Sequence, residues 1–139
     1  MKIIHKKIGF KTKGSGDLIN ITGSLSQALK ETALKIGNVT VFVCGSTAGI
    51  LTLEYEPGLI KDIGEFYEKL APSNPHYHHD DTWGDANGFS HIRASLTGQS
   101  LTVPFEDGKL LLGTWQQVVL AEFDNRPRSR ELTAQFIGE

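Results

Sequence analysis

The stretch SLTVPFEDGKLLLGTWQQVVLAEF, residues 100–123, decides the fold that we predict for this chain. Apolar and β-branched residues run on both sides of Asp107-Gly108, a pair that favours a tight turn between antiparallel strands. We therefore expect strands at 100–105, 109–112 and 116–123, with a further strand at 131–137. Four strands that follow one another without a helix indicate antiparallel pairing.

The residues before this stretch mix strands with helices. Alternating and β-branched segments predict strands at 2–10, 17–21, 39–44 and 50–55. Apolar residues at helical spacing predict a helix that starts at Thr22, includes Ile36 and is ended by Gly37. The same spacing predicts helices at 59–70 and, more briefly, at 89–96. Two main helices among seven or eight strands indicate an α+β fold class.

Composition is typical of one soluble globular domain spanning residues 1–139. Fourteen basic and sixteen acidic residues give a formal charge of −2, so we expect no nucleic-acid partner, which would need a strongly basic face. No apolar run is long enough for a membrane span or a signal peptide. A single cysteine, Cys44, excludes an internal disulfide, and we expect it to be buried. These features predict a cytoplasmic protein.

A histidine cluster is the strongest functional signal. Four of the five histidines, with Asp80 and Asp81, lie within residues 76–91. Imidazole titrates near neutral pH and is the commonest metal ligand. We expect His79 and His91 to converge in space as acid–base groups or metal ligands, with Glu54 or Glu56 as a carboxylate ligand. The alternative is a solvated polar loop. Asp80 can orient an imidazole or cap the following turn.

Two further segments suit a phosphate. The turn CGSTAG, residues 44–49, combines glycines with Ser46 and Thr47, and such turns expose backbone N–H groups. The segment RPRSR, residues 126–130, carries arginines at alternate positions, which in an extended chain point the same way. The alternatives are a simple tight turn and surface salt bridges. Trp115 and Gln116 either line the pocket or serve packing.

Residues 90–104, SHIRASLTGQSLTVP, and 112–118, LGTWQQV, resemble the YjbQ-like family, often labelled secondary thiamine-phosphate synthase enzymes. Tyr77-His78-His79-Asp80, Ser46-Thr47-Ala48 and Leu51-Thr52-Leu53 support the resemblance, which extends over the whole chain. It implies two packed antiparallel sheets, a homotrimer, and weak thiamine phosphate synthase activity, which joins a pyrimidine diphosphate to a thiazole phosphate. We expect the apolar late strand, QQVVLA at 116–121, to contribute to surface buried in such an assembly.

The chain departs from the family pattern at two points. Gly45 or Ser46 stands where many members carry histidine, and Glu54-Tyr55-Glu56 stands where many carry Asn-Glu. We therefore expect a subgroup with its own substrate.

The resulting prediction is an enzyme acting on a small phosphorylated metabolite, with a non-catalytic trimeric binding protein and a metal-dependent hydrolase as alternatives. The predicted catalytic residues are His79, His91, Asp80 and Arg93. The predicted substrate contacts are Ser46, Thr47, Trp115, Gln116, Arg126 and Arg128. The predicted ligands of a divalent metal, Zn or Mg, are His79, His91, Glu54 and Glu56.

Overall fold

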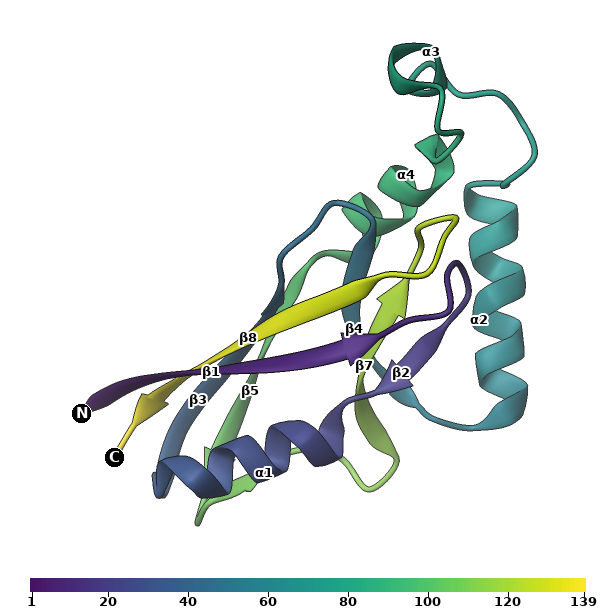
Figure 1. Cartoon of the computed structure of the whole chain (residues 1–139). Helices are drawn as coiled ribbons and strands as arrows, with labels where there is room; N and C mark the ends of the chain where they lie inside the picture. The colour runs from purple at the N-terminus through teal and green to yellow at the C-terminus, as the bar shows by residue number, and fades with distance from the viewer.

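Two antiparallel sheets form the body of the molecule (Figure 1). The computed structural model describes all residues, 1–139. The larger sheet has the order β1-β8-β3-β5-β6 and consists of β1 (Lys2–Lys11), β8 (Ser129–Gly138), β3 (Ile36–Val43), β5 (Ser100–Glu106) and β6 (Lys109–Leu110). The smaller sheet has the order β2-β7-β4 and consists of β2 (Leu18–Asn20), β7 (Gln116–Glu122) and β4 (Ala48–Glu54). The expected two-sheet antiparallel fold is confirmed.

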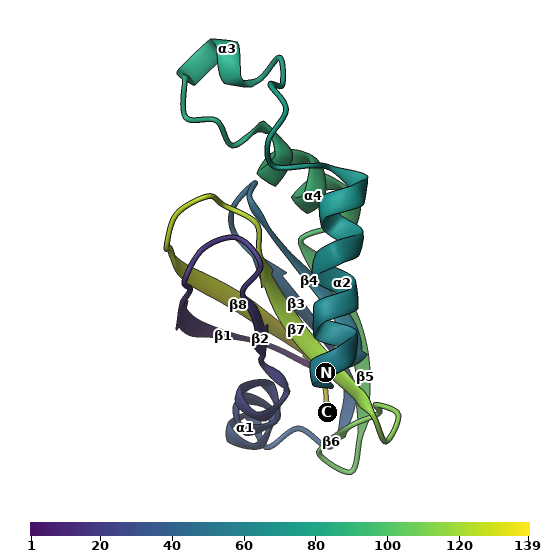
Figure 2. The same cartoon turned by 90° about the vertical axis from the view of Figure 1, so that its right-hand side faces the viewer.

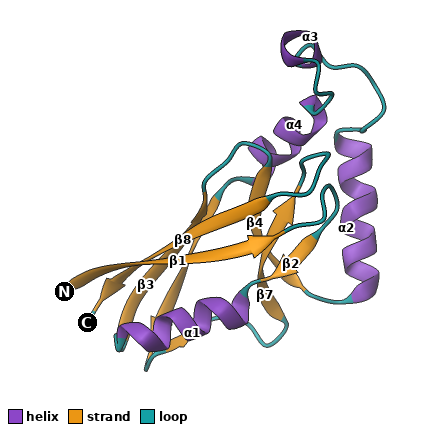
Figure 3. Cartoon of the chain, in the orientation of Figure 1, coloured by secondary structure: helices purple, strands orange, loops and turns teal.

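Four helices accompany the sheets: α1 (Thr22–Thr32), α2 (Pro57–Leu70), α3 (Asp80–Trp83) and α4 (Gly88–Thr97) (Figure 3). Helices α1, α2 and α4 lie where helices were expected, and only the short α3 was not predicted. Helix α1 ends before Ile36, contrary to the prediction. Ala33 adopts a left-handed conformation, and the Thr32 hydroxyl bonds the Leu29 carbonyl and accepts from the Leu34 N–H, which closes the helix. None of the helices combines the length and apolar character needed to cross a membrane.

Gly37 serves the sheet and not the helix end. It lies in β3 beside the end of β8, and a Cβ there would stand 2.1 Å from the Ile137 carbonyl oxygen. Only glycine permits this close approach of two backbones. The prediction correctly gave Gly37 a structural role, but placed that role at the end of α1 and not in β3.

The main core fills the space between the sheets. Seventeen buried apolar residues, among them Leu25, Ile50, Phe105 and Phe136, form one cluster that includes the inner face of α1. A second cluster lies on the other side of the small sheet, where Leu59, Ile60, Ile63 and Tyr67 of α2 pack over Leu53 and Val119. Figure 2 shows α2 lying along this sheet.

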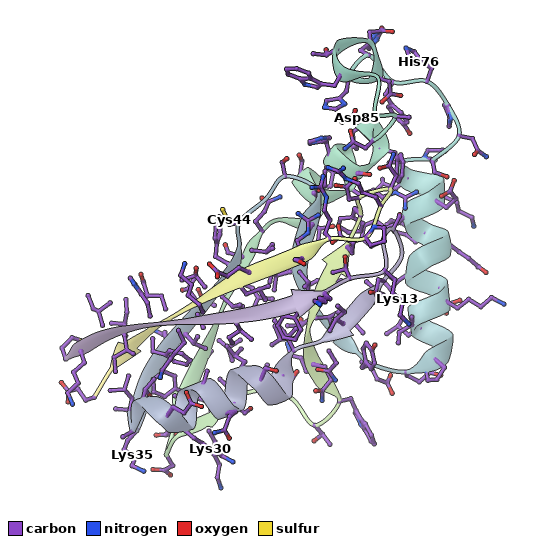
Figure 4. All side chains as sticks on the ribbon, in the orientation of Figure 1. Lys13, Lys30, Lys35, Cys44, His76 and Asp85 are labelled. Atoms are coloured by element: carbon purple, nitrogen blue, oxygen red, sulfur yellow. The ribbon has the colours of Figure 1, made fainter.

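Strand β7 is therefore covered on both faces within one chain. Residues Val118 to Phe123 are all buried, between the large sheet on one side and helices α2 and α4 on the other. The expectation that this apolar strand needs a partner subunit for burial is wrong for β7, because the helices supply the second layer. The expectation of a buried Cys44 is also wrong. It follows the last residue of β3 and is exposed (Figure 4).

Candidate functional site

A pocket of about 450 Å³ opens at the end of the molecule that carries α3. It is where the β3–β4 turn, the segment from α3 into α4, and the β7–β8 connection meet. Figure 4 shows Asp85 in this region, beneath α3. The ten lining residues are Gly45, Ser46, Thr47, His79, Trp83, Asp85, Asn87, His91, Arg128 and Arg130.

Two histidines lie side by side in this pocket, as expected from the sequence. The ring centroids of His79 and His91 are 4.3 Å apart, with an interplanar angle of 40°. His79 immediately precedes α3, and His91 lies on the first turn of α4. The two histidines are twelve positions apart in sequence, so they meet only because the segment between them folds back.

Asp80 folds that loop. One carboxylate oxygen accepts from the Tyr77 N–H at 3.0 Å, and the other accepts from the Gly88 N–H at 3.0 Å. A Cβ at Gly88 would stand 2.6 Å from the Cβ of Tyr77, so the loop closes tightly on this glycine. These N–H donors, the Tyr77 N–H first, lower the pKa of Asp80. The Asp80 carboxylate is 4.0 Å from His79 Nδ1, too far for a hydrogen bond, so its observed role is to close the loop through the two backbone N–H groups and not to orient the imidazole.

A buried ion pair supports Arg130. The Glu122 carboxylate is fully buried and accepts from Arg130 Nε at 2.8 Å and from the Thr12 hydroxyl at 2.8 Å. Arg130 Nη2 donates to Glu122 and, at 2.7 Å, to the hydroxyl of Thr47. Nη1 has no such partner, and it lies so close to Gly45 that a Cβ there would be 2.8 Å away. Glycine therefore leaves room for this guanidinium at the pocket wall.

A second pair holds Arg128 beside it. Arg128 Nε donates to the fully buried Asp124 at 2.6 Å, and the Thr47 hydroxyl and the Asn87 amide also donate to this carboxylate. Burial alone would raise the pKa of Asp124, but the hydrogen bond and charge of Arg128 outweigh burial, and the pKa is lowered. The Arg128 side chain remains 34% exposed, so part of its guanidinium faces the pocket.

The environment of His91 favours a neutral imidazole. Burial lowers the pKa of His91 below its usual 6.5, and the neighbouring His79 lowers it further. Asp85 and Asp124 oppose this shift without reversing it. A neutral imidazole at pH 7 can accept a proton.

Three buried polar atoms in this region have no hydrogen-bond partner within the chain: His79 Nδ1, Asn87 Oδ1 and Ser90 Oγ. Buried polar atoms are nearly always paired in folded proteins, so each unpaired one calls for an explanation such as a catalytic role or a bound ion or water. All three belong to the segment that carries the histidine pair.

The other predicted residues lie elsewhere. Glu54, Glu56 and Trp115 line a second pocket, of about 480 Å³, together with Asn20, Tyr55, Pro57, Thr114 and Gln117. Thr47 directly precedes β4 and Glu54 ends it, so the two pockets lie at opposite ends of one strand. Seven residues of strand span about 20 Å. The predicted substrate contacts are thereby divided between two places.

Gln116 and Arg93 have structural partners. Gln116 bonds the Thr52 hydroxyl and the Gly113 N–H and lines neither pocket. Arg93 is buried and donates to the Ala71 carbonyl and, at 2.7 Å, to Glu68. It joins α4 to the end of α2 and is not in the pocket. Arg126 is exposed and lines neither pocket, because it precedes β8 in a turn and does not share the strand alternation.

The predicted metal ligands do not meet within one chain. Glu54 and Glu56 are separated from His79 and His91 by the length of β4, and Glu56 caps α2 by accepting from the Gly58 and Leu59 N–H groups. No group of three or more His, Cys, Asp or Glu side chains is placed to hold a metal ion. The histidine pair alone offers two ligands, which does not fit the four-ligand site predicted from the sequence.

Sequence reasoning missed Glu122 and Asp124, which support the site, and Asn87 and Trp83, which line it. The sequence does contain a signal for these two carboxylates, because acidic residues come at the end of a strand of apolar residues and a basic segment follows. A buried charge must be paired, and those arginines are its nearest partners in sequence.

Comparison with known proteins identifies the family. A family model described as UPF0047 protein YjbQ-like matches residues 6–139. The chain belongs to the UPF0047, YjbQ-like family. A UPF0047 protein of Archaeoglobus fulgidus is 38% identical over 94% of this chain and 99% of its own length. Another, of Methanocaldococcus jannaschii, is 39% identical over 96% of this chain and 94% of its own length.

Solved structures of UPF0047 relatives share the fold. The crystal structure of a YjbQ-like protein of unknown function from Sulfolobus solfataricus superposes with a TM-score of 0.89 at 28% identity, covering 99% of this chain and 100% of that one. An uncharacterised family member from Clostridium acetobutylicum superposes with a TM-score of 0.82 at 34% identity, covering 94% and 99%. The family is thus established, and its function is uncharacterised.

Proposed function

We propose that the His79–His91 pocket is an acid–base site for a small phosphate-bearing molecule. The observation that carries this proposal is that the histidine pair and two arginines with free N–H groups line one pocket. A phosphate needs several N–H donors around it, and a reaction of its ester needs a group that moves a proton.

A phosphate in this pocket would be held by hydrogen-bond donors in fixed positions more than by a net positive charge. Glu122 and Asp124 already neutralise Arg130 and Arg128, but Nη1 of each guanidinium makes no hydrogen bond within the chain. The backbone N–H groups of Gly45 and Ser46 are likewise unpaired. Donors on a rigid frame lose little freedom when a ligand binds, which favours geometric recognition of a phosphate.

The histidine pair would supply proton transfer. His91 has a lowered pKa and is neutral at pH 7, so it can take a proton from a hydroxyl or water. The adjacent His79 lowers the pKa of His91 further, because a second positive charge beside this ring is unfavourable. We therefore propose His91 as the base, and His79 as a neighbour that contacts the substrate and adds to the effect of burial on the pKa of His91.

The family resemblance names the first reaction to test. In a thiamine phosphate synthase reaction, the ring nitrogen of a thiazole phosphate forms a bond to the methylene carbon of a pyrimidine diphosphate, and the C–O bond to diphosphate breaks. The attacking nitrogen carries no proton, so His91 would act on the amino group of the pyrimidine, taking a proton as diphosphate leaves and returning it as the new C–N bond forms. Arg128, Arg130 and the β3–β4 turn would stabilise the departing diphosphate. No metal step is needed for this proposal.

We propose that the chain forms a homotrimer in the cytoplasm. The resemblance implies the trimer. No helix covers the outer face of the five-stranded sheet, on which Ile3, Phe42 and Ile137 are exposed. A contact between chains there would bury apolar area that one chain leaves in water. Sedimentation equilibrium at micromolar concentration tests the assembly, and a stable monomer would contradict it.

A paired assay of turnover and binding tests the catalytic proposal. Diphosphate release from the pyrimidine diphosphate and thiazole phosphate mixture is measured for the wild type, for His91→Gln, and for His5→Gln, which changes a histidine on the large sheet. We expect turnover by the wild type and His5→Gln, and binding without turnover by His91→Gln. Saturable binding without turnover by the wild type, with and without Zn²⁺ or Mg²⁺, would favour the binding-protein alternative over this enzyme.

A further inference from the structure

The pocket at the other end of β4 has a wall of different chemistry. Two aromatic rings and a proline, those of Tyr55, Trp115 and Pro57, line it together with Glu54, Glu56 and three uncharged polar residues. No lysine, arginine or histidine is among the lining residues. The pocket thus combines aromatic faces with negative charge and contains no cation of its own.

Trp115 is poorly explained by packing. Its side chain is 72% exposed, in the connection that leads into β7, and it belongs to neither apolar cluster. Indole is the most favourable aromatic surface for a cation, because its face carries negative electrostatic potential. An exposed indole beside an acidic wall is therefore suited to a positively charged ligand.

Tyr55 provides a second ring in a fixed position. Its hydroxyl donates to the Leu18 carbonyl at 2.5 Å, which ties the ring to β2. The hydroxyl is occupied by this bond, so the ring offers the pocket mainly its aromatic surface. A ring held in place loses no freedom when a ligand packs on it.

Glu54 is the free charge of this pocket. Its carboxylate has no hydrogen bond or ion pair within the chain, whereas the Glu56 carboxylate is occupied by the N–H groups at the start of α2. The oxygens of the neighbouring amides are occupied, since Asn20 Nδ2 donates to Gln117 Oε1 at 3.2 Å and the Thr22 N–H donates to Asn20 Oδ1. One unpaired carboxylate beside two rings is the arrangement that attracts an organic cation.

We infer that this pocket is a second binding site, for a small organic ammonium ion. The cation would pack on the Trp115 and Tyr55 rings with Glu54 as its counter-charge. A free phosphate is excluded by the absence of any basic residue, and a neutral apolar ligand would leave Glu54 without a partner. The inference does not depend on the proposed function, because none of these residues lines the histidine pocket.

Choline, and its neutral isostere in which carbon replaces the quaternary nitrogen, provide the test. Each is titrated into the wild-type protein while the indole N–H signals of the two tryptophans are followed by NMR. The variant Trp83→Phe assigns the Trp115 signal, since the chain has two tryptophans. We expect saturable movement of the Trp115 signal with choline in the millimolar range, and at least about fivefold weaker binding of the neutral isostere.

Variants test whether Glu54 supplies the counter-charge for the bound cation. Glu54→Gln should weaken choline binding about threefold. Glu106→Gln, which changes an exposed glutamate outside the pocket, should not, and His79→Ala should leave choline binding intact. The inference is overturned if the Trp115 signal does not saturate, if the isostere binds as well as choline, or if Glu54→Gln binds choline like the wild type. A Trp115 signal that moves with protein concentration alone would show that another copy of the chain covers the pocket, which also overturns it.

Discussion

The two pockets at the ends of β4 differ in the residues that support their walls. Behind the histidine pocket, fully buried Glu122 and Asp124 hold two arginines in place through several short hydrogen bonds. Behind the aromatic pocket there is no buried charge, and its carboxylates are exposed. The histidine pocket is therefore supported by buried ion pairs that stabilise the core, whereas the aromatic pocket is formed by surface residues.

The buried pairs link the stability of the fold to the geometry of the histidine pocket. A buried ion pair is costly to desolvate, and removing one partner leaves the other charge uncompensated. In this chain the two pairs place arginine N–H groups at the wall of a pocket that also carries two histidines. In the aromatic pocket, Glu54 and Trp115 make no side-chain hydrogen bond within the chain and are exposed, so they can change with little cost to the fold.

The largest expected effect is on stability and comes from Glu122→Gln. This change leaves Arg130 buried with no counter-charge, so we expect the free energy of unfolding to fall by about 3–5 kcal/mol. Urea denaturation followed by circular dichroism measures it. The matched change Glu54→Gln in the aromatic pocket should alter stability by no more than about 0.5 kcal/mol. Equal stability of the two variants would show that the pockets do not differ in this way.

His79→Ala should separate function from folding. The side chain lies on a loop and makes no hydrogen bond within the chain, so the melting temperature should stay close to the wild-type value. Turnover should fall about a hundredfold or more, the usual contribution of an acid–base side chain. His78→Ala, which removes an exposed histidine outside the pocket, is the control. A variant that melts much lower and keeps full activity would make His79 a structural residue.

The pH dependence of turnover should report His91. Since burial and His79 lower the pKa of His91, its imidazole loses its proton below the usual 6.5, and the neutral form accepts the substrate's proton at higher pH. The profile of kcat/KM should thus be flat through neutral pH and fall about tenfold per unit below that lowered pKa. His79→Gln should raise the pKa of His91, as measured by NMR titration. An acid limb centred above 6.5 would contradict this assignment.

The strands and the histidine pair could be predicted because they depend on local patterns. Alternation and the Asp107-Gly108 turn gave the hairpin, and the density of histidines marked the loop. The separation of Glu54 from His79 could not be predicted. It depends on the histidine loop lying at the start of β4, whereas Glu54 is at the end of that strand. The inward direction of Glu122 also depends on tertiary contacts, since strand alternation does not reveal which face meets a second layer.

Diphosphate binding to the wild type, Arg128→Gln and Arg126→Gln tests the central claim most directly. The claim is that the histidine pocket of one chain is an anion site built by Arg128 and Arg130. Isothermal titration with inorganic diphosphate should show Arg128→Gln binding about tenfold more weakly, because a charged hydrogen-bond donor is lost. Arg126→Gln removes the same charge from an exposed turn outside the pocket and should bind like the wild type. Equal weakening by both variants, or no binding by the wild type, would contradict the claim.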